Sequence, residues 1–245
     1  MHCQPIKNTL VYICTNNDHI CLLCDEPAEQ PYPLCSACEQ ALPWLDEQCR
    51  RCALPLPIDG LLCGGCSRRP PAFSRVIAPW HYGFPIDTLV SRFKHNSQWP
   101  LGRLLAQLLS HSLMHHYAEG LPRPDRLLPV PLARRRLRQR GFNQAAMLAR
   151  WLAGQLRLPC DERLLQRVRD TPAQQALGAR ARQRNLRQAF ALAPGCELDG
   201  LHLALVDDVL TTGATAQAIA RLLRQAGARR VDIYCLARTP RPGQA

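Results

Sequence analysis

The sequence lacks any long uncharged apolar run. No run reaches the roughly eighteen residues that a membrane-spanning helix requires, so we expect no transmembrane segment. A secretory signal peptide is also missing, because Lys7 is a lone basic residue and polar residues 16–18 follow only a short apolar patch. These absences predict a cytoplasmic protein.

Lysine is nearly absent as well. Only Lys7 and Lys94 are lysines, so the formal net charge of +12 at pH 7 comes almost entirely from arginine. Arginine binds phosphate through planar, bidentate contacts, which favours a polyphosphate or nucleic-acid partner, although similar charge occurs on proteins that bind nothing acidic. Hydrophobic residues make up 47% of the 245 residues, which is enough for a buried core and excludes global disorder.

Cysteine, by contrast, is abundant and regularly spaced. Four Cys-x-x-Cys pairs begin fourteen residues apart. Two intervening residues let both sulfur atoms face one tetrahedral ion, and two pairs complete a closed Cys₄ site. The pattern therefore predicts two structural zinc ions and no catalytic zinc. The expected ligands are Cys21, Cys24, Cys35, Cys38, Cys49, Cys52, Cys63 and Cys66.

The spacing leaves the pairing of these motifs open. We expect sequential pairing, with the first two motifs on one ion and the last two on the other, and a crossed pairing is the alternative. The second motif is expected to open a short helix over residues 39–45, as in a treble clef, and the last two motifs look like a plain zinc ribbon. A disulfide framework or a redox-active dithiol is disfavoured in a chain without a signal peptide.

A short apolar run at residues 203–206 ends in two aspartates, Asp207 and Asp208. Such a run is typical of a buried parallel strand, and ligands of α/β sheets bind beyond the carboxyl ends of such strands. Adjacent carboxylates can accept hydrogen bonds from vicinal ribose hydroxyls, and their charge stabilises a sugar carbon that becomes cationic. We therefore expect Asp207 and Asp208 to act in catalysis at a sugar.

The residues that follow predict a phosphate site at the start of a helix. Gly213 lets the backbone approach a ligand closely, and apolar residues at helical spacing follow to Gly227, the expected C-cap. Phosphate binds well at a helix N-terminus because unpaired N–H groups point at it. The alternative is an ordinary strand, turn and helix with a threonine as N-cap. The expected phosphate-binding residues are Thr211, Thr212, Gly213, Ala214 and Thr215.

Strand and helix patterns alternate through the rest of the chain. Strands are expected at residues 76–82, 127–131 and 231–236, and helices at 86–93, 101–117 and 144–156. This alternation predicts a parallel α/β sheet. Residues 134–140 carry five arginines and are expected as a basic loop past a strand end, whereas 163–187 are typical of a mobile lid.

Three segments together resemble a known family. Residues 203–215 resemble the phosphoribosyl-pyrophosphate signature of type I phosphoribosyltransferases. Two further segments resemble the ComF/GntX family of competence and DNA-utilization proteins. They comprise Val130-Pro131-Leu132 with Arg136, Arg138 and Arg140-Gly141-Phe142-Asn143-Gln144, and Thr171, Gln174 and Leu177 with Arg182, Asn185 and Ala189-Phe190.

The resemblance implies an α/β fold: a parallel-sheet type I phosphoribosyltransferase-like domain preceded by a small double zinc-ribbon or treble-clef module. The implied domains are an N-terminal extension over residues 1–18, a zinc module over 19–70 and the phosphoribosyltransferase-like domain over 71–245. It also implies Mg²⁺ with phosphoribosyl pyrophosphate. The implied pyrophosphate and lid residues are Arg136, Arg140, Gln174, Arg182, Asn185 and Lys94.

The implied function is DNA uptake or utilization with a site for phosphoribosyl pyrophosphate or a related sugar phosphate or nucleotide. The sequence does not decide whether the protein catalyses a reaction, because it indicates neither a general base nor a pocket for an acceptor. The alternative is a non-catalytic protein that binds single-stranded DNA, with the zinc module contacting a helicase or uptake protein. Direct contact between the zinc ribbons and nucleic acid is a weaker reading, since the module has few aromatic residues.

Overall fold

The computed structural model describes residues 19–95, 97–169 and 188–240. The chain divides into two compact units, Met1–Leu42 and Pro43–Ala245. This division falls inside the cysteine-rich segment, so the last four cysteines of that segment lie in the same unit as the sheet. The predicted domain limits at residues 18 and 70 stay a prediction.

The described part of the first unit, residues 19–42, contains a small antiparallel pair and one short helix. Strand β1 (His19–Ile20) pairs with β2 (Pro27–Ala28), and helix α1 spans Ser36–Gln40. The expected helix over residues 39–45 was wrong in its limits. The chain enters α1 earlier because the Cys35 sulfur accepts a hydrogen bond from the Cys38 N–H at the helix start, and Pro43 disfavours continuation.

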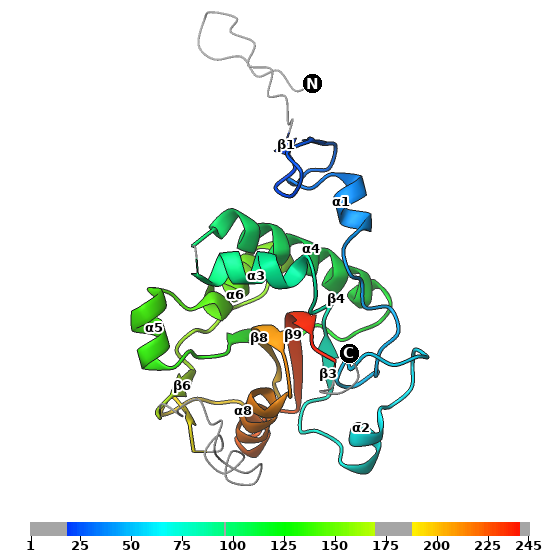
Figure 1. The fold of residues 1–245 in the computed structure, drawn as a ribbon. Helices are drawn as coiled ribbons and strands as arrows, with labels where there is room; N and C mark the ends of the chain where they lie inside the picture. The colour runs from blue at the N-terminus through cyan, green and yellow to red at the C-terminus, as the bar shows by residue number, and fades with distance from the viewer. Residues whose placement is uncertain (1–18, 96, 170–187, 241–245) are drawn as a thin grey trace, which may run out of the picture. The chain divides into compact units, whose positions relative to one another are not determined.

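A five-stranded parallel sheet forms the centre of the second unit (Figure 1). The strand order is β3-β9-β8-β5, and β4 also pairs with β9. All of these pairings are parallel, as the alternation of strands and helices predicted. The strands are β3 (Arg75–Ile77), β4 (Trp80–His81), β5 (Arg126–Pro129), β8 (His202–Leu210) and β9 (Arg230–Arg238).

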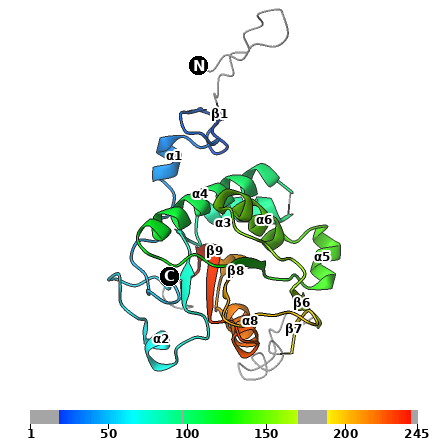
Figure 2. The ribbon, with the colours of Figure 1, turned by 180° about the vertical axis from the view of Figure 1, so that it is seen from behind.

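Helices cover both faces of this sheet. Figures 1 and 2 show α3, α4 and α6 on one face and α8 on the other. Leu203, Leu205 and Ile233 on the central strands are fully buried, which follows from covering both faces. The helices are α3 (Ile86–His95), α4 (Trp99–Ala118), α6 (Gln144–Leu156) and α8 (Ala214–Gln225).

Two predicted segments differ from the structure. The single strand expected over residues 76–82 is two short strands, β3 and β4, because Pro79 has no N–H to donate to β9. The basic loop expected over residues 134–140 is a helix, α5 (Arg134–Arg140). It ends at Gly141, whose φ of 82° is the left-handed conformation typical of a helix C-terminus.

The remaining described elements are short. Helix α2 (Gly64–Arg68) lies among the last four cysteines of the cysteine-rich segment, and β6 (Leu165–Arg167) pairs antiparallel with β7 (Phe190–Leu192). The lid predicted over residues 163–187 lies largely outside the described residues. Within the described part of the chain, no helix combines the length and apolarity needed to cross a membrane.

Candidate functional site

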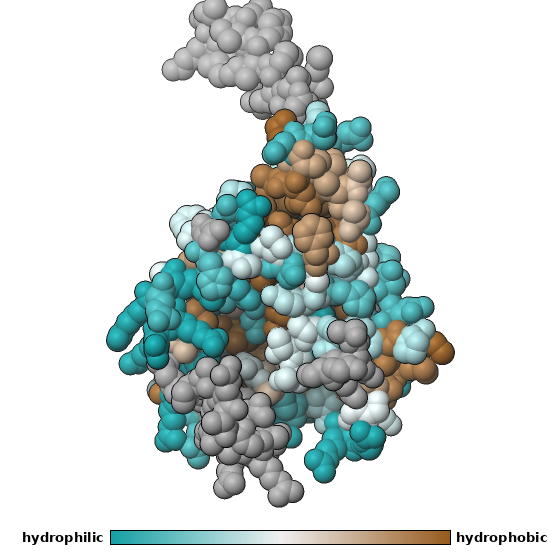
Figure 3. Space-filling model, in the orientation of Figure 1, coloured by the Kyte–Doolittle hydropathy of each residue, from teal (hydrophilic) through white to brown (hydrophobic). Residues whose placement is uncertain are grey.

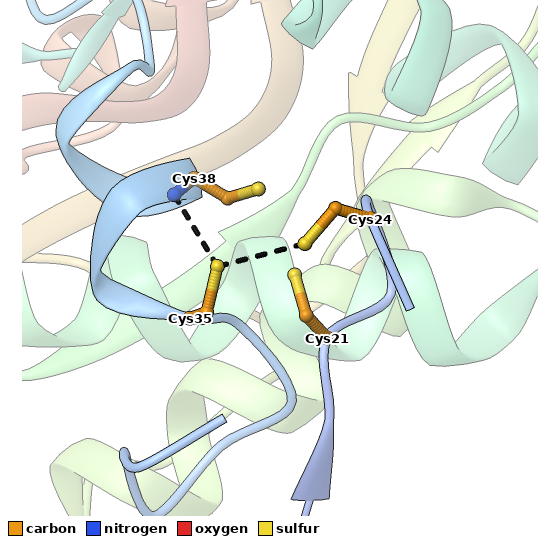
Figure 4. A group of neighbouring side chains, drawn as sticks. All are labelled: Cys21, Cys24, Cys35 and Cys38. Carbon is orange, nitrogen blue, oxygen red and sulfur yellow. Dashed lines mark hydrogen bonds between the residues drawn. The ribbon is translucent and has the colours of Figure 1, made fainter. Parts of the chain in front are cut away.

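The eight predicted metal ligands form two separate groups. Within each group the four sulfur atoms lie within 4.8 Å of one another. Figure 4 shows the first group, in which side chains from the β1–β2 turn and from the start of α1 face a common space. The sequential pairing is thereby confirmed, and the crossed alternative is wrong. The groups are Cys21, Cys24, Cys35 and Cys38, and Cys49, Cys52, Cys63 and Cys66.

The chemistry of both groups fits zinc. Burial raises the pKa of the Cys21 thiol, but N–H groups of Cys35, Leu23 and Cys24 outweigh this effect and bring the pKa to about 6. Cys49 is similar, since N–H groups directed at its sulfur bring its pKa to about 7 despite burial. Each group thus holds one readily formed thiolate among close thiols, and a divalent cation is needed for all four to ionise.

The two groups differ in their surroundings. Cys24 in the first group is exposed, whereas Cys49, Cys63 and Cys66 in the second group are buried. The second group lies in an apolar cluster with Leu54, and the Cys63 N–H donates to the Cys49 sulfur at 3.2 Å. Both are Cys₄ zinc-ribbon sites with no open position, so their zinc has a structural role.

The two aspartates of the sugar-site prediction lie inside a strand. Strand β8 was expected to end at residue 206, but it continues to Leu210. The longer partner β9 explains this difference, because parallel pairing runs on from Asp207 opposite Cys235 to Leu210 opposite Arg238. The pairing of β8 with β9 therefore fixes the backbone positions of Asp207 and Asp208.

Asp208 lies at the centre of a buried polar group. It is 6% exposed, and its Oδ2 accepts hydrogen bonds from the Lys94 ammonium at 3.0 Å and from Gln144 Nε2 at 2.9 Å. Lys94 is held there by its neighbour Phe93, which is fully buried and packs against the rings of Phe142 and Trp151. Lys94, one of the predicted phosphate-site residues, lies on α3 and contacts the aspartate pair through Asp208.

Asp207 has a different electrostatic environment. Burial of its carboxyl, together with the negative charge of Asp208, raises the pKa of Asp207 to about 8. The N–H of Asp208 and the Lys94 ammonium oppose this shift. Asp207 therefore holds its proton more readily than an ordinary aspartate, and a ligand cation or hydroxyl beside it would favour its ionised form.

The predicted phosphate loop connects β8 to α8. Gly213 is the N-cap of α8 and adopts φ 72°, a left-handed conformation. A Cβ built on Gly213 would meet no protein atom within 4 Å, so the space above this glycine is open. Thr211 and Thr212 are exposed, and the Thr212 hydroxyl accepts a hydrogen bond from the Ala214 N–H at 3.3 Å. The loop presents hydroxyls and helix N-terminal N–H groups to solvent, as anion sites do.

The segment from Gly141 to Gln144 joins the basic helix to the aspartates. Gly141 ends α5, and the Asn143 side chain caps α6 by accepting from the Ala145 N–H at 3.0 Å while donating to the Val130 carbonyl at 3.1 Å. This turn places Gln144 against Asp208. Gln144 belongs to a motif of the family resemblance, but the sequence alone did not indicate a role for it.

The predicted pyrophosphate residues lie on α5. Burial lowers the pKa of the Arg140 guanidinium, the Asp208 carboxylate opposes that shift, and Arg136 adds to it, so the three charges interact. Arg136 is exposed, and Figure 3 shows hydrophilic side chains gathered over α5 on the left of the view. Gln174, Arg182 and Asn185 lie outside the described residues. Of the other candidates, the structure brings together Asp207, Asp208, Lys94 and Arg140.

Known proteins share this combination of parts. A family model of the double zinc ribbon domain matches residues 18–67, and one of the phosphoribosyl transferase domain matches residues 143–244. The DNA utilization protein YhgH of Salmonella typhi is 40% identical over 222 residues, which are 90% of this chain and 97% of that protein. The competence protein F of Haemophilus influenzae is 35% identical over 207 residues, 84% of this chain and 90% of that protein. This chain belongs to the ComF family.

Membership of the ComF family agrees with the predicted fold class. The zinc ribbons precede a parallel-sheet phosphoribosyltransferase-like domain, as the sequence predicted. Among solved structures, a purine phosphoribosyltransferase from Pyrococcus horikoshii Ot3 superposes with a TM-score of 0.34 and 17% identity, covering 55% of this chain and 70% of that chain. This likeness is too loose to add to the family assignment.

Proposed function

We propose that the carboxyl end of β8 and the start of α8 bind phosphoribosyl pyrophosphate or a related sugar phosphate. The observation that carries this proposal is the aspartate pair on one strand, followed within a few residues by an open glycine loop at a helix N-terminus. Carboxylates suit vicinal hydroxyls, and the loop suits a phosphate.

Each residue has a role in this proposal. Asp207 and Asp208 accept hydrogen bonds from the ribose hydroxyls, and residues 211–215 bind the 5′-phosphate. Arg136 and Arg140 neutralise pyrophosphate, with Gln174, Arg182 and Asn185 as lid residues. Mg²⁺, when bound with the ligand, would neutralise pyrophosphate charge beside Asp207 and Asp208, since it seldom relies on protein ligands alone.

Two features of the described residues support a polar ligand here. Gln144 Oε1 is buried and has no hydrogen-bond partner, although Nε2 of the same amide is bound to Asp208. A buried acceptor without a donor is costly, and a ligand hydroxyl or a water would satisfy it. Lys94 and Arg140 also leave the site with positive charge beside the aspartates, which suits an anionic ligand.

The cellular role that we propose is DNA uptake or utilization in the cytoplasm. Relatives that match most of this chain are named DNA utilization protein and competence protein. Such a role is compatible with a sugar-phosphate enzyme and with a ligand-controlled binding protein. Contact with a helicase or an uptake protein through the zinc ribbons is part of the same proposal.

Calorimetric titration of phosphoribosyl pyrophosphate in the presence and absence of Mg²⁺ tests the ligand. We expect binding that requires Mg²⁺ and that falls about ten- to a hundredfold in Asp207→Ala, since a hydrogen bond to a charged acceptor contributes about 1.5–3 kcal/mol. Asp199→Asn is the matched control, because this exposed carboxylate precedes β8 at the opposite end of the strand. No detectable binding by the parent protein would exclude the proposed ligand.

A second candidate is single-stranded DNA binding without turnover. It is favoured by α5, a seven-residue helix that carries five arginines and no acidic residue. Binding through phosphates would weaken steeply with salt, and replacing Arg136 and Arg140 with methionine would weaken it equally for all sequences. Affinity that stays constant between 50 and about 200 mM salt would contradict this electrostatic mode.

A further inference from the structure

The second cysteine group and the proposed phosphate loop line the same cavity. The cavity has a volume of about 970 Å³. Cys52, Cys63 and Cys66 contribute to one wall, and residues 211–214 with Gln217 contribute to another. A zinc ligand and a phosphate-binding residue therefore face the same space, although they are far apart in the sequence.

One buried arginine connects these two walls. Arg238, at the end of β9, is 6% exposed. Its Nε donates to the carbonyl of Cys52 at 3.0 Å, and its Nη1 donates to the carbonyl of Leu210 at 2.9 Å. Nη1 also donates to the carbonyls of Thr211 and Thr239. A single guanidinium thus holds a zinc ligand's backbone and the first residue of the loop.

A second contact holds the other end of the loop. Gln217, in the first turn of α8, accepts a hydrogen bond through Oε1 from the N–H of Ala72 at 2.8 Å. Ala72 follows the linker that leaves the second cysteine group through Pro70 and Pro71. The loop is therefore connected to the zinc-ribbon segment on both sides, before Thr212 and after Thr215.

We infer that the second zinc site positions the phosphate loop, with Arg238 as a positioning residue for the ligand. This inference rests on the proposed function of the loop. The carbonyl of Leu210 accepts from Arg238 and also from the Thr239 N–H, and the carbonyl of Thr211 accepts from Arg238, so Arg238 helps to hold both in their present orientation. The loop binds phosphate through backbone N–H groups, whose directions depend on that same backbone.

Arg238→Met tests this role against Arg230→Met. Both arginines lie on β9, one at each end, and both changes remove one positive charge. Arg230 pairs with the fully buried Asp232 at the opposite end of the sheet, so its loss also perturbs a buried charge pair. We expect Arg238→Met to weaken phosphoribosyl pyrophosphate binding about tenfold or more, with both zinc ions retained, and Arg230→Met to bind within about twofold of the parent.

Two further variants keep the inference testable if Arg238→Met does not fold. Arg238→Lys keeps the charge and a donor and should recover part of the affinity, whereas Gln217→Met should weaken binding about threefold without a change in charge. Parent-like affinity in the folded Arg238 variants and in Gln217→Met would overturn the inference and leave the proposed function intact. Absence of binding by the parent protein would instead overturn both.

Discussion

The two Cys₄ sites have the same ligands at the same spacing but different relations to the rest of the chain. The first site lies in a small unit with β1, β2 and α1. The second site belongs to the unit that contains the sheet, where the Arg51 carbonyl accepts from the Val76 N–H and Ala53 is buried in the sheet core. The same motif thus lies in a small unit with two short strands and a helix in the first case, and in the unit of the parallel sheet in the second.

The packing of the second site's residues against the sheet determines how zinc loss affects the stability of the sheet unit. A zinc site stabilises what it crosslinks, and the second site crosslinks residues that pack against β3 and β9. Leu45 donates its N–H to the Pro79 carbonyl, which further joins the segment before the second site to the β3–β4 edge. Removing zinc from the second site should therefore destabilise the sheet. Removing zinc from the first site should destabilise the residues around that site alone.

The largest expected effect is on stability when a ligand of the second site is lost. Cys66→Ser should lower the free energy of unfolding of the sheet unit by about 4 kcal/mol, because it removes a metal ligand from a buried apolar cluster. Cys38→Ser, the corresponding position of the first site, should change it by less than about 0.5 kcal/mol. Denaturant unfolding followed by Trp fluorescence measures both. Equal losses in the two variants would remove the distinction between the sites.

Asp207→Asn should have an intermediate effect that depends on pH and is confined to the sheet unit. The folded-state pKa of about 8 lies above the ordinary aspartate value of 3.8, so between these values the unfolded state ionises while the folded state stays protonated, and stability falls as pH rises. Asparagine removes this cost and still accepts the Asp208 N–H. Its stabilising effect should be about 1–2 kcal/mol larger at pH 8.5 than at pH 6, allowing for partial solvent exposure.

Chemical unfolding at these two pH values provides the test. The range keeps the cysteines bound to metal, so zinc release does not obscure the result. The Asp199→Asn variant, which removes an exposed carboxyl from the same unit, is the matched control. A stabilising effect of Asp207→Asn that is the same at both pH values would mean that Asp207 ionises normally.

The smallest effect is expected at the phosphate loop itself. Gly213→Ala places a Cβ in open space but at φ 72°, so it should cost about 1 kcal/mol of stability through the left-handed conformation alone. Thermal unfolding should therefore report a small decrease, and Gly154→Ala, at a site on α6 with no close neighbour and no positive φ, should not. A larger loss than about 2 kcal/mol would indicate packing that the described structure does not contain.

Local patterns in the sequence predicted much of this molecule. The eight cysteine ligands follow from motif spacing, which left their pairing open, and the run from β8 to α8 follows from an apolar stretch, a glycine and a helical period. Helix α5 was missed because residues 134–140 contain one apolar residue, Leu137, and so show no amphipathic face. The break between β3 and β4 depends on Pro79, whose effect on strand pairing was overlooked.

Contacts between distant residues were beyond the reach of these patterns. The bond from Arg238 to Cys52 joins residues 186 positions apart, and the bond from Gln144 to Asp208 joins residues 64 apart. Neither pair has a local signature, because each depends on which loop or helix packs beside a strand of the sheet. The sequence therefore indicated a phosphate loop and a zinc ribbon separately, and only the fold connects them.

Stepwise zinc removal with simultaneous measurement of ligand affinity tests this connection most directly. A chelator should remove zinc first from the first site, where Cys24 is exposed, and later from the second site. We predict that affinity for phosphoribosyl pyrophosphate with Mg²⁺ stays constant while the first equivalent of zinc is lost, and disappears with the second. Affinity that falls in proportion to the first equivalent, or that survives the loss of both, would contradict the account.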